Sequence, residues 1–392
     1  MSRLPKKYST VPLKLLSFHF YATNAILIGF LPIYLQYKGL SGVRVGWVLA
    51  AGPLASILSQ PFWGYMSDKH KTVQKILVIC LVGFLISSIL FFQMDNFYYI
   101  LSASLLLFFF STPIGALTDS LSQKVAQEIG ISFGSIRVWG SIGFALSSLI
   151  VGAILNKLGI GSTSFILLPL ILFTGYLILK LPDAKYDSNS KVSLKDLKLI
   201  IYNRSLMIFL LLSMFLTITQ RMNDNFIGLY ILELGGTESL VGLAWFMALL
   251  GEGIVFGLSF YWYGKLKLHF LQYIMFAAAM YIVRWFSYAY VTKIVYIIFL
   301  QLLNGLTFAV FYLAAFAYIS HLLPKKLHST GHLFFITILF GVSGFFSAIS
   351  GGIIMDTVGG RTLYILLGIC ATLGFIMISL YYMKSIRVRT NT

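Results

Sequence analysis

The stretch that decides the fold is a short polar interruption between two apolar segments, Pro61-Phe62-Trp63-Gly64-Tyr65-Met66-Ser67-Asp68-Lys69-His70-Lys71. The excess of positive charge at the inner ends of membrane spans accounts for Lys69 and Lys71, but it does not account for Gly64 or Asp68. A glycine lets two helix backbones approach closely. An aspartate caps the N-terminus of a following or neighbouring helix and pairs with a base there. We therefore predict a specialised turn between two membrane spans rather than a plain solvated loop.

The composition outside this stretch is that of a membrane protein. Apolar residues make up 58% of the 392 residues, charged residues make up 10%, and the mean hydropathy is +0.88. A soluble domain carries roughly 25% charged residues. The apolar segments are continuous rather than alternating, which excludes the pattern of a β-barrel. About 20 apolar residues span a bilayer as a helix, so we predict an all-α polytopic protein with twelve spans, at 13–37, 43–66, 75–93, 97–122, 134–156, 163–181, 205–234, 238–263, 268–290, 293–323, 329–356 and 361–384.

The net charge of +17 follows the predicted topology instead of indicating nucleic-acid binding. Lysine and arginine gather at both termini and in alternate loops, so we expect both termini and the 182–204 loop in the cytoplasm and attraction to anionic lipid in the cell membrane.

Cys80 and Cys370 lie inside spans and imply no disulfide framework. No cluster of histidine and acidic residues indicates a metal or another cofactor, and we expect a monomer.

The chain contains an internal repeat at an offset of half its length. Four residues recur at a constant offset of 196, since 226 − 30 = 196; the pairs are Phe30 and Phe226, Tyr34 and Tyr230, Gly39 and Gly235, and Gly46 and Gly242. Lys69 and Lys71 match Lys265 and Lys267 at that offset, and a looser echo relates Gly152 and Gly159 to Gly352 and Gly359. Two six-helix halves, 1–181 and 205–392, joined by a linker at 182–204, explain this pattern.

Charged residues inside the predicted spans are candidate functional groups, because each costs about 2.5–3.5 kcal/mol on the insertion scale. Those at least three residues from a predicted span end are Asp119, Arg137, Arg221, Asp224, Glu252 and Arg284. Asp119 and Arg137 fall at similar depth in consecutive antiparallel spans, and Phe144 follows Arg137 by two helical turns. An acid, a guanidinium fork and an aromatic plane form a candidate sugar site, to which Asn24 of the first span is a further candidate. The alternative is a simple salt bridge between helices.

Glu252, Arg284 and Asn304 form a second candidate group, for proton coupling. A carboxyl in an apolar environment holds its proton more tightly, and a nearby guanidinium favours its release. Glu252 is therefore the candidate proton carrier, and the alternative is a static Glu252–Arg284 bridge. Arg221 and Asp224 are three residues apart on one span, so we expect an ion pair along one helix face, in a structural role.

The order Gly-Tyr-Met-Ser-Asp-Lys at 64–69 resembles the signature between the second and third helices of the major facilitator superfamily. The in-span charges resemble those of the branch that contains the lactose and phenylpropionate permeases, which are oligosaccharide–proton symporters and their relatives. This resemblance implies gating by Gly64, Asp68 and Lys69, solute binding by Asp119, Arg137 and Phe144, and proton coupling at Glu252, Arg284 and Asn304. The lactose permease has a histidine and a glutamate at the positions that match Asn304 and Thr307. Neither residue here titrates near neutral pH, so coupling falls on Glu252 or Asp119, or is absent.

From these observations we expect a transporter that is not an enzyme and that imports a small hydrophilic solute with a proton. A sugar or oligosaccharide is the first candidate, and a nucleoside or an aromatic acid comes next. Three alternatives stay open, namely efflux of an amphipathic compound, a uniporter, and a membrane sensor that transports nothing.

Overall fold

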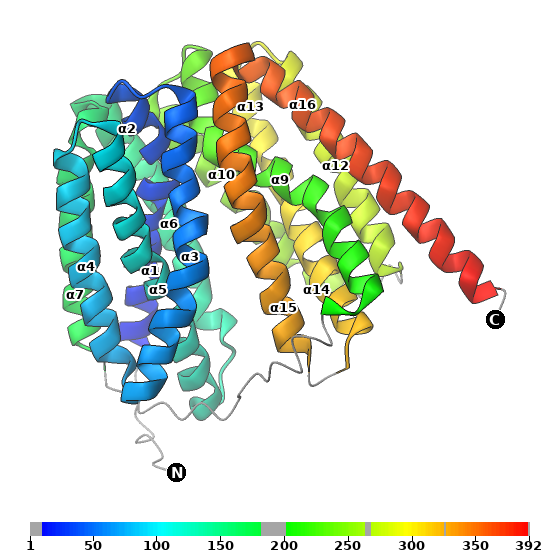
Figure 1. Cartoon of the computed structure of the whole chain (residues 1–392), viewed down its shortest axis with the longest axis horizontal. Helices are drawn as coiled ribbons and strands as arrows, with labels where there is room; N and C mark the ends of the chain where they lie inside the picture. The colour runs from blue at the N-terminus through cyan, green and yellow to red at the C-terminus, as the bar shows by residue number, and fades with distance from the viewer. Residues whose placement is uncertain (1–9, 182–200, 263–267, 325–326, 391–392) are drawn as a thin grey trace. The chain divides into compact units, whose positions relative to one another are not determined.

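The computed structural model describes residues 10–181, 201–262, 268–324 and 327–390 (Figure 1). Most of the predicted linker, and Lys265 and Lys267 of the repeat, lie outside these residues. The chain folds into two compact units. The N-terminal unit contains residues 1–189 and 237–246, and the C-terminal unit contains 190–236 and 247–392.

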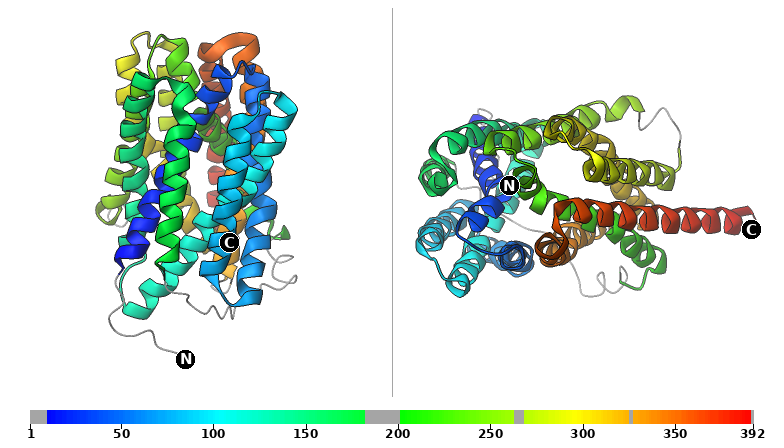
Figure 2. Two further views of the ribbon diagram at one scale, coloured as in Figure 1. Left: turned by 90° about the vertical axis from the view of Figure 1, so that its left-hand side faces the viewer. Right: turned by 90° about the horizontal axis from the view of Figure 1, so that it is seen from above.

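The N-terminal unit is a bundle of helices that run alongside one another (Figure 2). Its elements are α1 (Val11–Gly29), α2 (Leu31–Tyr37), α3 (Gly42–His70), α4 (Val73–Gln93), α5 (Phe97–Ile129), α6 (Gly134–Leu158), the 3₁₀ turn η1 (Ile160–Ser162) and α7 (Thr163–Leu179). The helix α1 packs on α6 and α7, and α5 packs on α3 and α4. The first predicted span is divided at Phe30 into two helices, α1 and α2. Pro32, in the first turn of α2, has no backbone N–H to continue the hydrogen bonding of α1.

The C-terminal unit repeats this plan with more distorted helices. Its elements are α9 (Arg204–Glu233), most of α10 (Glu238–Gly257), α11 (Ser259–Trp262), α12 (Phe270–Tyr290), α13 (Ile294–Leu300), a 3₁₀ turn η2 (Gln301–Leu303), a π-helical segment η3 (Gly305–Ala309), α14 (Val310–Leu322), α15 (His328–Ile336), a second π segment η5 (Thr337–Val342) and α16 (Ser343–Thr390). α16 packs against both α9 and α12.

The predicted all-α polytopic fold is confirmed. Eleven stretches in the described part are long and apolar enough to cross a membrane. The last of them, Thr330–Lys384, contains Gly359, whose φ of 77° and ψ of 170° are not helical. Figure 1 shows the chain reversing direction between the orange and red parts of this stretch. Counted as two crossings, it brings the total to the twelve predicted spans.

The internal repeat is visible in the backbone. Gly39 follows α2, the second part of the first span, and Gly235 follows α9, with φ of 80° and 84°. Gly159 and Gly359 likewise end matching helices, with φ of 84° and 77°. Only glycine adopts this left-handed region without steric cost. The glycines of the repeat therefore mark equivalent turns.

The interpretation of residues 61–71 needs two corrections. α3 continues as a helix to His70 and ends at Lys71 in the left-handed region, so the stretch is the end of a helix rather than a loop. Thr72, not Asp68, caps the following helix, because its side chain accepts a hydrogen bond from the backbone N–H of Lys75. Among the described residues, no atom lies within 4 Å of a Cβ built at Gly64. The expectation of a close backbone approach at Gly64 is therefore wrong.

Candidate functional site

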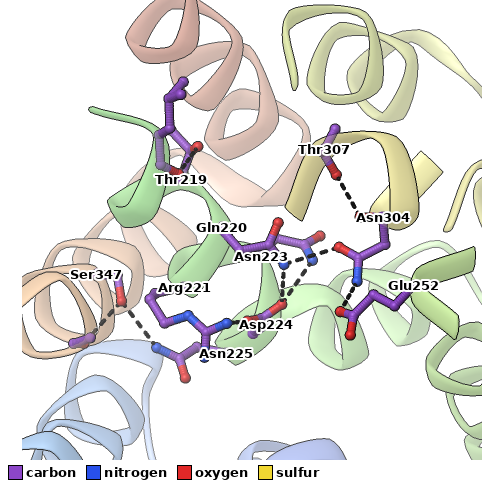
Figure 3. Close-up of polar contacts among 12 residues, drawn as sticks. Thr219, Gln220, Arg221, Asn223, Asp224, Asn225, Glu252, Asn304, Thr307 and Ser347 are labelled. Atoms are coloured by element: carbon purple, nitrogen blue, oxygen red, sulfur yellow. Dashed lines mark hydrogen bonds and ion pairs between the residues drawn. The ribbon is translucent and has the colours of Figure 1, made fainter. Parts of the chain in front are cut away.

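A chain of hydrogen-bonded polar side chains, most of them buried, lies in the C-terminal unit (Figure 3). It begins on α9, where Arg221 Nη2 lies 2.6 Å from Asp224 Oδ2. Gln220 Nε2 donates to Asp224 Oδ1 at 2.9 Å and to Asn304 Oδ1 at 3.2 Å. Asn304 Nδ2 then donates to Glu252 Oε1 at 2.5 Å. The expected Arg221–Asp224 contact is thus formed, and it connects through two amides to Glu252.

The orientation of the Asn304 amide follows from its neighbours. Arg284 Nη1 donates to Asn304 Oδ1 at 2.7 Å, and a guanidinium has only donors. The atom of Asn304 that faces Arg284 must therefore be the oxygen. Its NH₂ group is then directed at Glu252, which must accept. Asn304 thus lies between Arg284 and Glu252, accepting from the first and donating to the second.

Arg284 does not bridge directly to Glu252. Its side chain is fully buried and donates to Asn304, Gln301 Oε1 at 2.6 Å, Thr307 Oγ1 at 3.0 Å and Tyr288 Oη at 3.1 Å. Its guanidinium carbon also lies 4.8 Å from the ring centroid of Trp285. In the part of the chain that the structure describes, no cation lies within ion-pair distance of Glu252. The alternative of a static Glu252–Arg284 bridge is therefore not what this structure contains.

Close backbone packing holds Glu252 beside Asn304. A Cβ built at Gly251 would stand 2.2 Å from the carbonyl oxygen of Leu302, and one built at Gly305 would stand 2.2 Å from the carbonyl oxygen of Gly251. These two glycines are the immediate neighbours of Glu252 and Asn304. The opposing helix also changes from 3₁₀ to π geometry at this point, a distortion that often accompanies functional sites.

The N-terminal unit contains a smaller charged group. Arg137 Nε lies 3.3 Å from Asp119 Oδ2, and Tyr21 Oη donates to the same oxygen at 3.3 Å. The Arg137 guanidinium lies over the Tyr21 ring, 4.0 Å from its centroid. The side chains of Asp119 and Arg137 remain 30% and 33% exposed, while Asp119 Oδ1 is buried and accepts no hydrogen bond from any residue that the structure describes. The pair is thus accessible and retains an unused acceptor.

Glycine makes room for this group on α6. A Cβ at Gly140 would stand 2.5 Å from the Tyr21 ring and 2.9 Å from Arg137 Nη1. The guanidinium therefore lies level with Gly140, one turn before Phe144. Phe144 is buried and its ring lies 5.5 Å from that of Trp245. Asn24 is half-buried, and its side chain donates to the carbonyl of Phe20 on its own helix at 3.2 Å.

Sequence reasoning missed several members of both groups. Gln220 and Gln301 carry no charge and were not predicted as site residues. Both are only 2% exposed, and an amide side chain within an apolar span indicates a candidate functional residue. Tyr21 stood out in the sequence only as one of many aromatic residues.

Among the described residues, no three histidine, cysteine, aspartate or glutamate side chains gather closely enough to hold a metal ion.

Membrane-length helices in two repeated halves, with charged groups buried inside the spans, define a secondary transporter of the major facilitator superfamily. Residues 10–366 match the model of the MFS_1 like family, and the chain belongs to that family. Its members are transporters rather than enzymes, as the residues at 64–69 and the in-span charges predicted.

Two relatives and one solved structure illustrate the likeness. The uncharacterized transporter YwbF of Bacillus subtilis (strain 168) is 28% identical over 371 residues, covering 94% of this chain and 92% of that protein. The maltose permease of Geobacillus stearothermophilus is 24% identical over 362 residues, covering 92% and 91%. The crystal structure of the nucleoside transporter NupG superposes with a TM-score of 0.81 at 18% identity, covering 95% of this chain and 98% of that one. The last likeness concerns the fold alone.

Proposed function

We propose that the protein imports a small hydrophilic solute together with a proton by alternating access, with a sugar or oligosaccharide as the first candidate. The observation that carries this proposal is the partly exposed Asp119–Arg137 pair inside membrane-spanning helices. Charges in that position are costly and face cavities or partners far more often than lipid. The protein would act as a monomer in the cell membrane, with both termini in the cytoplasm, where the basic loops favour them.

The chemistry of the pair favours a solute with hydroxyl groups. Asp119 Oδ1 can accept a hydrogen bond that no described residue donates, and Arg137 has N–H groups that donate. A hydroxyl group can donate a hydrogen bond to the Asp119 carboxylate or accept one from the Arg137 guanidinium. Two neighbouring hydroxyl groups can do both at once. Phe144, one turn beyond the guanidinium, supplies an apolar surface. The maltose permease among the relatives supports a sugar, while a nucleoside also carries such hydroxyls on its ribose.

Glu252 is the proposed proton carrier. Its described hydrogen bond comes from an amide N–H, which suits the ionised carboxylate and the acceptor oxygen of the neutral acid alike. Arg284 acts on it through Asn304 and favours release of the proton. Gly64, Asp68 and Lys69 at the end of α3 are proposed to gate transport, as their resemblance to the superfamily signature suggests.

The test is uptake and binding by the purified protein with three probes, namely maltose, uridine and 3-phenylpropionate. In proteoliposomes we expect maltose to accumulate when a pH gradient is imposed, and calorimetry should detect its binding in detergent. Arg137→Lys should lose binding by about tenfold or more, because an ammonium does not reproduce the planar fork.

The matched control for this variant is Asp95→Asn. It breaks the ion pair between Asp95 and Lys38 in the same unit, where the aspartate is 83% exposed. Such surface pairs contribute little to stability, and this one is remote in sequence from the proposed site. Parent-like binding by Arg137→Lys would reduce the Asp119–Arg137 pair to a structural bridge. Accumulation of maltose that ignores the pH gradient would favour a uniporter.

A further inference from the structure

We propose that Trp245 of α10 contacts the solute, forming the aromatic wall of the Asp119–Arg137 site together with Phe144 and donating its indole N–H to a solute oxygen. This inference rests on the proposed function, because it extends the site assigned there. It concerns a residue outside the charged pattern that first indicated the site.

The position of Trp245 is the first observation. The helix α10 begins in the N-terminal unit, where residues 237–246 belong with α1 and α6. The Trp245 and Phe144 rings lie 5.5 Å apart and are tilted by 55°. The other edge of the indole faces α1, where a Cβ built at Gly29 would stand 3.2 Å from Nε1. Because Gly29 has no side chain, this edge of the indole packs directly against the backbone of α1.

The unpaired N–H is the second observation. Nε1 of Trp245 is buried and has no hydrogen-bond partner in the described part of the chain. Trp63 and Trp285 share this property, but their side chains are buried at 7% and 0% exposure. Trp245 alone of the three remains partly exposed. Because a buried donor without an acceptor is unfavourable, an incoming oxygen at this position would gain a hydrogen bond that no protein group already makes.

The spacing along α6 relates the aromatic wall to the charged pair. The Arg137 guanidinium lies level with Gly140, and Phe144 follows Gly140 by four residues on the same helix face, about 6 Å along the axis. That separation suits one sugar ring, with hydroxyl groups at Asp119 and Arg137 and a less polar face against Phe144 and Trp245. A pyranose offers both surfaces.

The experiment measures maltose binding by calorimetry and by the change in tryptophan fluorescence in purified protein. Trp245→Phe keeps an aromatic ring and removes the N–H, and Trp245→Ala removes both. Trp63→Phe is the matched control, because it removes an equally unpaired indole N–H in the same unit away from the site. We expect Kd for maltose to rise about tenfold in Trp245→Phe, further in Trp245→Ala, and not at all in Trp63→Phe. The maltose-dependent fluorescence change should disappear only in the Trp245 variants.

Each outcome decides the assignment. If Trp245→Phe binds maltose with the parent Kd, Trp245 is packing alone, and the sugar proposal still stands. If the parent binds uridine and not maltose, the sugar proposal falls, and the same variants and criteria apply to uridine, whose ribose also carries hydroxyl oxygens. If the parent binds none of the three probes, both proposals are overturned. Should Trp245→Phe unfold, Gly29→Ala replaces it, since the added Cβ crowds Nε1. Parent-like affinity in that variant rejects the contact.

Discussion

Gly251→Ala should break the hydrogen bond between Asn304 and Glu252 by forcing two helix backbones apart. The new Cβ would stand 2.2 Å from the carbonyl oxygen of Leu302, whereas ordinary contact begins at 3.4 Å. The backbones must therefore separate by about 1.2 Å, and the neighbouring Asn304–Glu252 distance, now 2.5 Å, would lengthen to about 3.7 Å if it opened with them, beyond a hydrogen bond. Overpacking of this kind costs about 1–3 kcal/mol.

Gly253→Ala is a matched control on the other side of Glu252. No described atom lies within 4 Å of a Cβ built there, and alanine favours a helix over glycine by up to about 1 kcal/mol. We expect Gly251→Ala to melt at least about 2 °C below the parent in detergent, with Gly253→Ala at or slightly above it. Accumulation driven by a pH gradient should fall about tenfold in Gly251→Ala alone. Equal melting temperatures and equal accumulation in the two variants would refute the reasoning.

Three further variants test the proposed roles. Glu252→Gln mimics a permanently protonated carrier, so it should exchange solute in counterflow but fail to concentrate it; unchanged concentration would exclude this residue as the carrier. Asp68→Asn should slow uptake with little effect on calorimetric affinity, and normal uptake would remove its gating role. Tyr21→Phe keeps the ring beneath Arg137 and loses the hydrogen bond to Asp119, so Kd for maltose should rise only a few-fold. A rise as large as that in Arg137→Lys would mean that the hydroxyl group of Tyr21 matters more than its ring.

The fold was predictable because each span must satisfy its own backbone within the bilayer. That requirement makes long continuous apolar segments diagnostic of helices, and the repeat followed from glycines whose backbone conformation admits little else. The pairing of Asp119 with Arg137 was predictable for a related reason. Two opposite charges at equal depth in adjacent spans have few other ways to lower their cost.

The details of the site depend on helix rotation, which the order of residues does not specify. Asn304 was singled out by position, but its role as a link between Arg284 and Glu252 depends on an amide orientation that only the surrounding donors determine. Gln220 joins two groups from different helices and carries no charge that would draw notice. The cap at Thr72 was missed because α3 continues beyond the last apolar residue, and helix ends are governed by local hydrogen bonds rather than by hydropathy.

The left-handed glycines at 39, 159, 235 and 359 have a consequence for how this chain diverges over time. Their requirement concerns backbone shape, and it is indifferent to what crosses the membrane. After a gene duplication and a change of cargo, the pocket residues are free to drift while these turns are not. We expect the spacing between twin turns to persist in descendants whose specificity has changed beyond recognition, so that it records common descent more faithfully than the residues that hold the cargo.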